Sequence, residues 1–157
     1  MLEMEELVRT NPAPHGFVYR GLAAFLLKHG REWPVAASQH VPRFHAWPQA
    51  CFSNAARLAR RKSAQWRYVE GYAVGHVIPV HHAWCVNAQD EVVDPTWFQR
   101  GFAGTEYFGA EIPVEVVDRV QHKDCQSVLM NWRRGYPLFR EPWEDVPRGS
   151  KVEHSHS

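Results

Sequence analysis

Hydrophobic and polar residues change their spacing several times along the chain, and each spacing predicts a different element. Between residues 16 and 30, Leu22, Ala23 and Leu26 recur at helical intervals, which predicts a short amphipathic helix that ends at Gly30. The next stretch, 31–48, contains three prolines and three large aromatic residues without a regular period, so irregular backbone is expected there.

Residues 48–62 return to a helical spacing that is built mainly from small apolar residues. Pro48 suits the first helical position, and the alanines at 55 and 56 would let the helix pack closely against a sheet. Four basic residues close the segment: Arg57, Arg60, Arg61 and Lys62. Cations near a helix C-terminus suit the helix dipole, so this run is interpreted as a solvent-exposed helix end.

From residue 66 onward the hydrophobic spacing becomes two. Aromatic and β-branched residues alternate through 66–75, which predicts a strand, and residues 75–79 are expected to turn into a second strand that contains His82. A third strand is expected to end at Asp94, because the proline that follows cannot donate to a sheet. Residues 98–106, with two glycines, are expected to form a loop.

The C-terminal third predicts one more strand and a closing helix. The strand is expected at 107–117, with Pro113 marking an edge position or a bulge, and the short helix around 127–132. Residues 1–14 begin with an acidic segment of one or two helical turns, and residues 141–157 are polar and proline-punctuated, which predicts a flexible tail.

These elements together predict an α+β fold over residues 1–140 as a single domain. In it, the helix that begins near Pro48 packs on an antiparallel β-sheet. At 157 residues, of which 45% are hydrophobic, the chain is long enough to bury a substantial core.

Composition and charge exclude several classes of protein. A formal net charge of +1 lacks the basic excess that polyanion binding needs, so no nucleic-acid partner is expected. No run of about 18 apolar residues predicts a membrane span, and no signal-peptide pattern is seen, so a cytoplasmic location is expected. Three cysteines, Cys51, Cys85 and Cys125, do not make a disulfide framework. The sequence leaves the oligomeric state open.

Cys51 is the candidate nucleophile. It falls in the first turn of the predicted helix, where the partial positive charge of the helix N-terminus favours a thiolate, the reactive form of the side chain. The alternative is a small buried hydrophobic residue, as most free cysteines are. Cys85 and Cys125 are interpreted as structural.

His82 and Asp94 are the candidate base and orienting acid. On a strand, His82 shares one face with Trp84 and Val86, an apolar face suited to packing on the helix, whereas His81 points the other way and is expected at the surface. For His82 to lie directly opposite Asp94, the strands need a three-residue loop, Asn87–Gln89, or a bulge. The alternative for Asp94 is a turn initiator before proline.

Three runs together resemble the core of the transglutaminase-like superfamily, within the papain-like cysteine group. They are Tyr68-Val69-Glu70-Gly71-Tyr72, His82-Ala83-Trp84 and Val93-Asp94-Pro95-Thr96-Trp97. In that superfamily a cysteine at a helix start precedes a strand that ends in Gly-Tyr, a His-Ala-Trp strand and an Asp-Pro-Thr strand end. The resemblance covers residues 48 to 97, about a third of the chain.

The resemblance implies a papain-like, transglutaminase-like core with Cys51 as nucleophile, His82 as base and Asp94 as orienter. The implied chemistry is hydrolysis or acyl transfer at an amide, ester or thioester through a thioester on Cys51, with no cofactor. A peptide, a protein or a small amide or amine would be the substrate. Backbone N–H groups at the helix start would stabilise the oxyanion.

Further candidates surround these three residues, and each has a structural alternative. Gln49 is a candidate oxyanion donor or an exposed first-turn residue. The candidates for the pocket are Asn54, Glu70, Trp84 and Tyr107. Asn54 would bond near the cleft or cap locally, Glu70 would point into the site or into solvent, and Tyr107 would line the pocket or belong to the aromatic core.

Two other functions compete with this interpretation. A metal site would use His81 and Cys85, which share a strand face, with His76 nearby, but neither a CxxC pair nor an HExxH motif occurs, so no metal is expected. The second alternative is a non-catalytic protein- or ligand-binding module on the same fold.

Overall fold

A computed structural model of the protein describes residues 15–36, 43–61, 65–121 and 126–143. The acidic N-terminal segment, Cys125, Lys62 and most of the predicted tail lie outside these described residues. None of the described helices is both long enough and apolar enough to cross a lipid bilayer.

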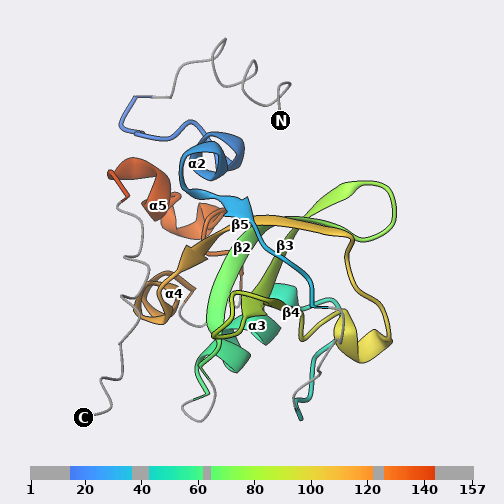
Figure 1. The fold of residues 1–157 in the computed structure, drawn as a ribbon. Coiled ribbons are helices and arrows are strands. Elements are labelled where there is room, and N and C mark those ends of the chain that lie inside the picture. Colours follow the sequence, from blue (N-terminus) through green and yellow to red (C-terminus); the bar gives the residue numbers. More distant parts are fainter. Residues whose placement is uncertain (1–14, 37–42, 62–64, 122–125, 144–157) are drawn as a thin grey trace, which may run out of the picture.

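A curled antiparallel sheet of five strands forms the centre of the fold (Figure 1). The order of strands across the sheet is β1-β5-β2-β3-β4, and each neighbouring pair is antiparallel. The strands are β1 (Arg31–Glu32), β2 (Arg67–Val74), β3 (Pro79–Val86), β4 (Val92–Val93) and β5 (Glu106–Ile112). Of the five, β2, β3 and β5 are long, and β1 and β4 have two residues each at the two edges.

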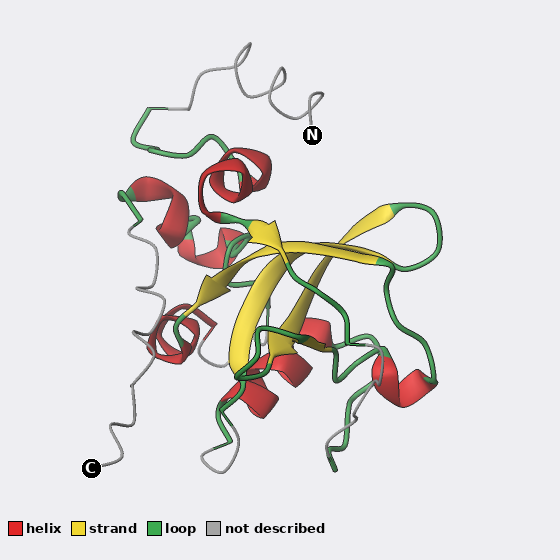
Figure 2. Ribbon diagram, viewed as in Figure 1, coloured by secondary structure: helices red, strands yellow, loops and turns green. Residues whose placement is uncertain are grey.

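The α-helices pack on one face of this sheet, which gives the predicted mixed α+β architecture (Figure 2). They are α2 (Leu22–His29), α3 (Cys51–Ala59), α4 (Val114–Gln121) and α5 (Pro137–Arg140). Their apolar side chains form one core with the sheet residues Tyr68, Ala83, Cys85, Ala110 and Ile112. Burial of these apolar side chains is the main stabilisation of the fold.

The opposite face of the sheet is covered by loops and by a short 3-10 helix, η1 (Phe98–Arg100). A second core there contains Trp33, Trp84, Phe98 and Tyr107, all buried. Gly71 of β2 lies level with both His82 and Gly109, and a Cβ at Gly71 would lie 2.2 Å from the carbonyl oxygen of Phe108. The close approach of β2 and β5 beside His82 therefore requires glycine at position 71.

Helix α3 begins three residues later than its sequence predicts. Pro48 and Gln49 form a turn, with Gln49 in the left-handed region at φ 54°, and Cys51 is the first helical residue. Helix α2 likewise begins at Leu22 rather than near residue 16, but Gly30 caps it as predicted.

The predicted strand at 107–117 is wrong in its second half. β5 ends at Ile112, and the carbonyl of Pro113 accepts hydrogen bonds from the N–H groups of Val116 and Val117, which starts α4. Nor is β5 at an edge, since it lies between β1 and β2. Without an N–H, proline cannot extend the ladder, but it suits the start of a helix.

The closing helix expected at 127–132 is also displaced. Residues 128–130 form a bend and a turn, and a 3-10 helix, η2, follows at Trp132–Arg134. Asn131 accepts the hydrogen bond from the Arg134 N–H that starts η2.

The connection between β3 and β4 differs from the predicted three-residue loop. Cys85 lies level with Val93 and Val86 with Val92, so residues 87–91 form the loop. The Asn87 Oδ1 atom accepts hydrogen bonds from the N–H groups of Gln89 and Glu91, which stabilises this wider turn. In this register Asp94 lies level with Trp84, a diagonal neighbour of His82 on the same face.

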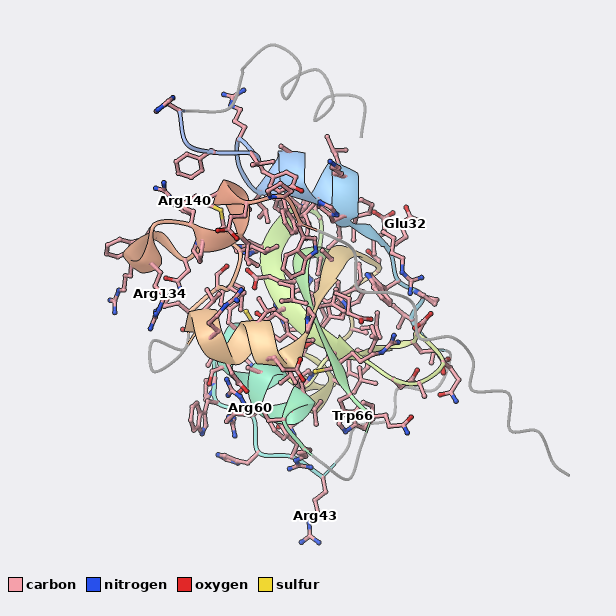
Figure 3. All side chains as sticks on the ribbon, turned by 90° about the vertical axis from the view of Figure 1, so that its left-hand side faces the viewer. Glu32, Arg43, Arg60, Trp66, Arg134 and Arg140 are labelled. Carbon is pink, nitrogen blue, oxygen red and sulfur yellow. The ribbon has the colours of Figure 1, made fainter. Side chains whose placement is uncertain are left out.

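The basic run at the end of α3 is not simply solvated, as expected from its sequence. Arg57 lies over the rings of Phe44 and Trp47 and donates to the carbonyl of His45, while Arg61 donates to the carbonyl of Arg43. Figure 3 shows Arg60 where α3 meets α4, and there its guanidinium pairs with Asp118. Arg57 and Arg61 therefore fasten the segment 43–47, which leads to Cys51.

Candidate active site

Cys51 lies at the N-terminus of α3, in the first turn as predicted, and its side chain is partly exposed. The first N–H groups of a helix have no partner within the helix, so those of residues 51–53 are available to bind an anion. Gln49 is exposed and has a positive φ two residues before the thiol. A non-glycine residue in this conformation costs on the order of 1 kcal/mol, and such strain is concentrated at functional sites.

Asn54 is fully buried one turn after Cys51 and connects three segments. Its amide exchanges two hydrogen bonds of 2.9 Å with the backbone of Trp47, and its Nδ2 also donates to Thr96 Oγ1 at 3.0 Å. The segment before Cys51 is thereby joined to the turn that follows Asp94. Asn54 therefore does not cap the helix, and its hydrogen bonds join the segment before Cys51 to Thr96.

His82 and Asp94 form a buried pair. The His82 Nε2 atom lies 2.7 Å from Asp94 Oδ2, and the two residues are 3% and 0% exposed. Cys51 lies near enough to His82 to help raise the pKa of its imidazole. The fold thus brings the three predicted residues together.

The two carboxylate oxygens of Asp94 have separate partners. Oδ1 accepts hydrogen bonds of 3.0 Å from the N–H groups of Thr96 and Trp97, which makes Asp94 the turn initiator that its proline suggests. Oδ2 accepts from His82 and, at 3.0 Å, from the Tyr107 hydroxyl. Both interpretations of Asp94 made from the sequence therefore apply at once, and the turn contacts orient the carboxylate that binds His82.

The reason for choosing His82 over His81 is wrong, although the structure places His82 with Asp94. The apolar flank of α3 packs on the face of Ala83 and Cys85, not on the face of His82 and Trp84. The α3 residue that affects the pKa of His82 is Cys51, the first residue of the helix. His81 lies on the α3 face, where its ring is 4.9 Å from that of Phe52.

Aromatic rings restrict the His82 imidazole on its own face of the sheet. The ring of Trp97 stacks on it with centroids 4.0 Å apart, and Trp84 lies 6.2 Å away. Tyr107 packs its edge on Trp84 and accepts a hydrogen bond from the Gly104 N–H. Trp84 and Tyr107 are core residues that also border the site.

Charge favours the protonated form of His82. Burial lowers the pKa of His82, but the charge and hydrogen bond of Asp94, together with the nearby Cys51, outweigh burial and raise this pKa to about 9. Burial and the Asp94 charge also raise the pKa of the Tyr107 hydroxyl, which therefore stays protonated as a donor to Asp94.

Raising the pH through 9 is expected to remove up to about 3 kcal/mol of stability that the His82–Asp94 pair supplies. Because the pKa of His82 is raised from 6.5 to about 9 on folding, this stabilisation is complete below about pH 6.5 and is lost as the pH rises through 9. Urea unfolding of wild type and His82→Gln between pH 6 and 10 measures it. The difference between the two proteins should shrink across this window, and a constant difference would contradict the pairing.

Glu70 is not solvated, because it is fully buried and surrounded by hydrogen-bond donors. Tyr68 donates to its Oε2 at 2.7 Å, and His81 to its Oε1 at 2.9 Å. Ser127 and the N–H groups of Val128 and Leu129 complete the set. Glu70 therefore fastens the segment 127–129 to the sheet.

Sequence reasoning missed several contacts of the site. Thr96 and Trp97 belong to the Asp-Pro-Thr-Trp run on which the family resemblance rests. That run could have indicated that both residues contact the site, but neither residue is assigned a role from the sequence alone. No local pattern pointed to Ser127, since it lies 57 residues after Glu70 in the chain.

The residues considered for a metal site are separated by their other contacts. His81 pairs with Glu70, the Cys85 thiol donates to the carbonyl of Ala55, and His76 stacks on Phe102. Over the described ranges, no group of three or more His, Cys, Asp or Glu residues is placed to hold a metal ion.

Comparisons with known proteins add no relative: the chain matches no protein-family model, no curated protein and no solved structure. The function of the protein is therefore inferred from the geometry of the site.

Proposed function

We propose that this protein is a cysteine hydrolase or acyltransferase with a transglutaminase-like, papain-like core. The observation that carries the proposal is the connected set of Cys51, His82 and Asp94. A thiol at a helix N-terminus lies near a buried imidazole and raises its pKa, and the Nε2 atom of this imidazole lies 2.7 Å from a buried carboxylate. Nucleophile, base and orienting acid in this arrangement are the parts that acyl transfer through a covalent intermediate requires.

The first half-reaction would form a thioester. The imidazole of His82 takes the thiol proton, and the Cys51 sulfur attacks the carbonyl carbon of an amide, ester or thioester. The resulting oxyanion accepts hydrogen bonds from unpaired N–H groups at the start of α3, with Gln49 as a candidate side-chain donor. His82 then gives its proton to the leaving amine, alcohol or thiol as the carbonyl re-forms.

The second half-reaction would release the acyl group. His82 removes a proton from water or from an amine, which attacks the thioester carbonyl, and the proton returns to the Cys51 sulfur. Water gives a hydrolase and an amine gives an acyltransferase. The peptide, protein or small amide substrate expected from the sequence is compatible with either outcome.

Asp94 and its neighbours would keep the base in one orientation. With Nε2 bonded to Asp94, the other ring nitrogen is left for the thiol proton. Trp97 stacks on the ring and Tyr107 donates to the same carboxylate oxygen, so rotation of either partner would break several contacts. Such preorganisation supports the proposal because it lowers the cost of reaching a reactive geometry.

Mass spectrometry of the protein after incubation with a panel of acyl thioesters and activated esters tests the proposal. An adduct with the mass of the acyl group is expected on Cys51, and hydroxylamine should remove it because it is a thioester. Cys51→Ala should not form it, and Cys85, a buried thiol in the same chain, is the internal control.

Absence of a Cys51 adduct with every donor, combined with slow alkylation of Cys51 by iodoacetamide at neutral pH, would overturn the proposal. The same result would favour a non-catalytic binding module on this fold.

A further inference from the structure

A row of aromatic rings extends from the candidate base to the tip of the β2–β3 hairpin. Trp97 stacks on His82 at 4.0 Å, Phe102 lies 4.8 Å from Trp97, and His76 stacks on Phe102 at 5.3 Å. Phe102 and Trp97 also contact Gly75, where a side chain would approach them to 3.0 and 3.3 Å. The hairpin and the segment after Asp94 are thus packed together by this row.

A groove of about 470 Å³ lies along this row, between the hairpin and η1. Figure 1 shows the hairpin projecting from the body of the protein, with η1 on the same side. Trp97 and Phe102 line the groove from one segment, and Val77, Ile78 and Val80 from the other. The proposed function uses none of the three aliphatic residues.

The aliphatic side chains of the groove are open to solvent. Val77 is 84% exposed, Ile78 73% and Val80 44%. Turns usually carry polar residues, and a contiguous exposed apolar patch beside a site marks a surface that binds something apolar. This cluster is therefore suited to an apolar ligand group.

The groove borders the candidate active site through Trp97 and β3. Val80 precedes His82 by two residues and shares its face of β3, about 7 Å along the strand. Trp97 belongs to both, since it lines the groove and stacks on His82. A substrate whose carbonyl carbon lies at Cys51 could therefore extend one substituent into the groove.

One charged residue, Arg100, is among the residues that line the groove. Its side chain is exposed, and within the described part of the chain no carboxylate pairs with it. Arginine binds carboxylates through paired N–H groups, so a negatively charged substituent beside the apolar one would complement this groove.

We infer that this groove is the specificity subsite for a peptide-like acyl donor with a bulky apolar side chain, flanked by a carboxylate that pairs with Arg100. The inference rests on the proposed function and adds the substrate class. In each turnover the donor carbonyl carbon bonds to the Cys51 sulfur, the leaving thiol or amine departs with the proton from His82, and the apolar side chain stays in the groove.

Matched peptide thioesters test the inference, with thiol release as the readout. The donors differ only in the residue beside the thioester, which is Phe, Leu or Ser, and in a neighbouring Asp or Asn. Wild type is expected to prefer Phe or Leu over Ser by roughly tenfold or more in kcat/KM. Asp should be preferred over Asn several-fold at low salt, and this preference should weaken as salt is added.

Variants of the groove should change these ratios. Val77→Ser combined with Ile78→Ser is expected to bring the Phe-to-Ser ratio close to one, and Arg100→Gln to remove the preference for Asp. Val18→Ser, at a valine that is 46% exposed elsewhere, is the matched control and should leave both ratios unchanged. Thermal unfolding of each variant verifies that it is folded.

The outcomes separate the two claims. If no donor acylates Cys51, the proposed function fails. If donors acylate Cys51 but Phe, Leu and Ser react at equal rates, or the hairpin variants keep the Phe-to-Ser ratio, the inference alone fails. Sedimentation that shows a wild-type dimer lost in Val77→Ser/Ile78→Ser would overturn it in favour of a second copy on this patch.

Discussion

Replacing His82 by glutamine is expected to lower kcat/KM by at least about 10⁴-fold for any donor that acylates Cys51. Glutamine is uncharged and cannot exchange a proton near neutrality, so neither thiol activation nor protonation of the leaving group would remain. Its amide can still donate to Asp94, which limits the damage to the buried carboxylate. Initial rates with an activated thioester, at a temperature where the variant is folded, give the measurement.

The neighbouring His81→Gln variant is the matched control. His81 donates to Glu70 rather than to Asp94, and a glutamine amide can replace that hydrogen bond. The loss in kcat/KM should therefore stay below about tenfold. In wild type, the rate should fall on the alkaline side as His82, whose pKa is raised to about 9, loses its proton. Comparable losses in the two variants would contradict the assignment of His82 as the base.

Replacing Glu70 by glutamine is expected to lower the free energy of unfolding by about 3–5 kcal/mol. The carboxylate is fully buried and accepts hydrogen bonds from Tyr68, His81, Ser127 and two backbone N–H groups. In glutamine one oxygen becomes an NH₂ group, which would face donors such as the N–H of Val128 without an acceptor. Urea unfolding followed by tryptophan fluorescence measures the change.

Glu111→Gln is the matched control for Glu70, in the strand that pairs with β2. Glu111 is partly exposed and pairs with Arg67, so its loss should cost about 1 kcal/mol or less. The segment 127–129 is expected to exchange its amide hydrogens faster in Glu70→Gln, because the N–H groups of Val128 and Leu129 bond to different oxygens and one of them loses its acceptor. Equal losses of unfolding free energy in the two variants would contradict the prediction that the buried hydrogen bonds of Glu70 stabilise the fold more than a surface ion pair does.

The long elements could be predicted from the sequence because they are locally consistent. The alternating pattern of Arg67–Val74 favours only a strand, and the alanine face of α3 favours only a helix. The fold contains both elements. Pro113 shows the limit: its strand-like neighbours favoured a continuing strand, but the helical hydrogen bonds to its carbonyl decide the structure there. Short elements such as β1 and β4 have too few residues for any periodicity to be read.

Within the site, the residue types could be predicted, but most of their partners could not. Asp94 was expected beside His82, and the structure places it there by a diagonal contact rather than a direct cross-strand pair, because Asn87 stabilises a wider loop. The role of Glu70 depends on Ser127 and the N–H groups that follow it, which arrive from a distant part of the chain. A local pattern carries no information about such partners.

Local patterns were enough to predict which side chains are available for chemistry: a thiol in the first turn of a helix, and a histidine and an aspartate on consecutive strands in that order. The spacing of residues along the chain is sufficient for this prediction, because helices and strands that are neighbours in the sequence each show their own hydrophobic periodicity. The packing of the whole chain was needed to show that the apolar flank of α3 covers the face opposite His82, and that Glu70 is buried. Both results depend on which face of the curled sheet each of the two hydrophobic cores covers. That choice depends on the apolar surface buried by the whole chain, so no single segment encodes it.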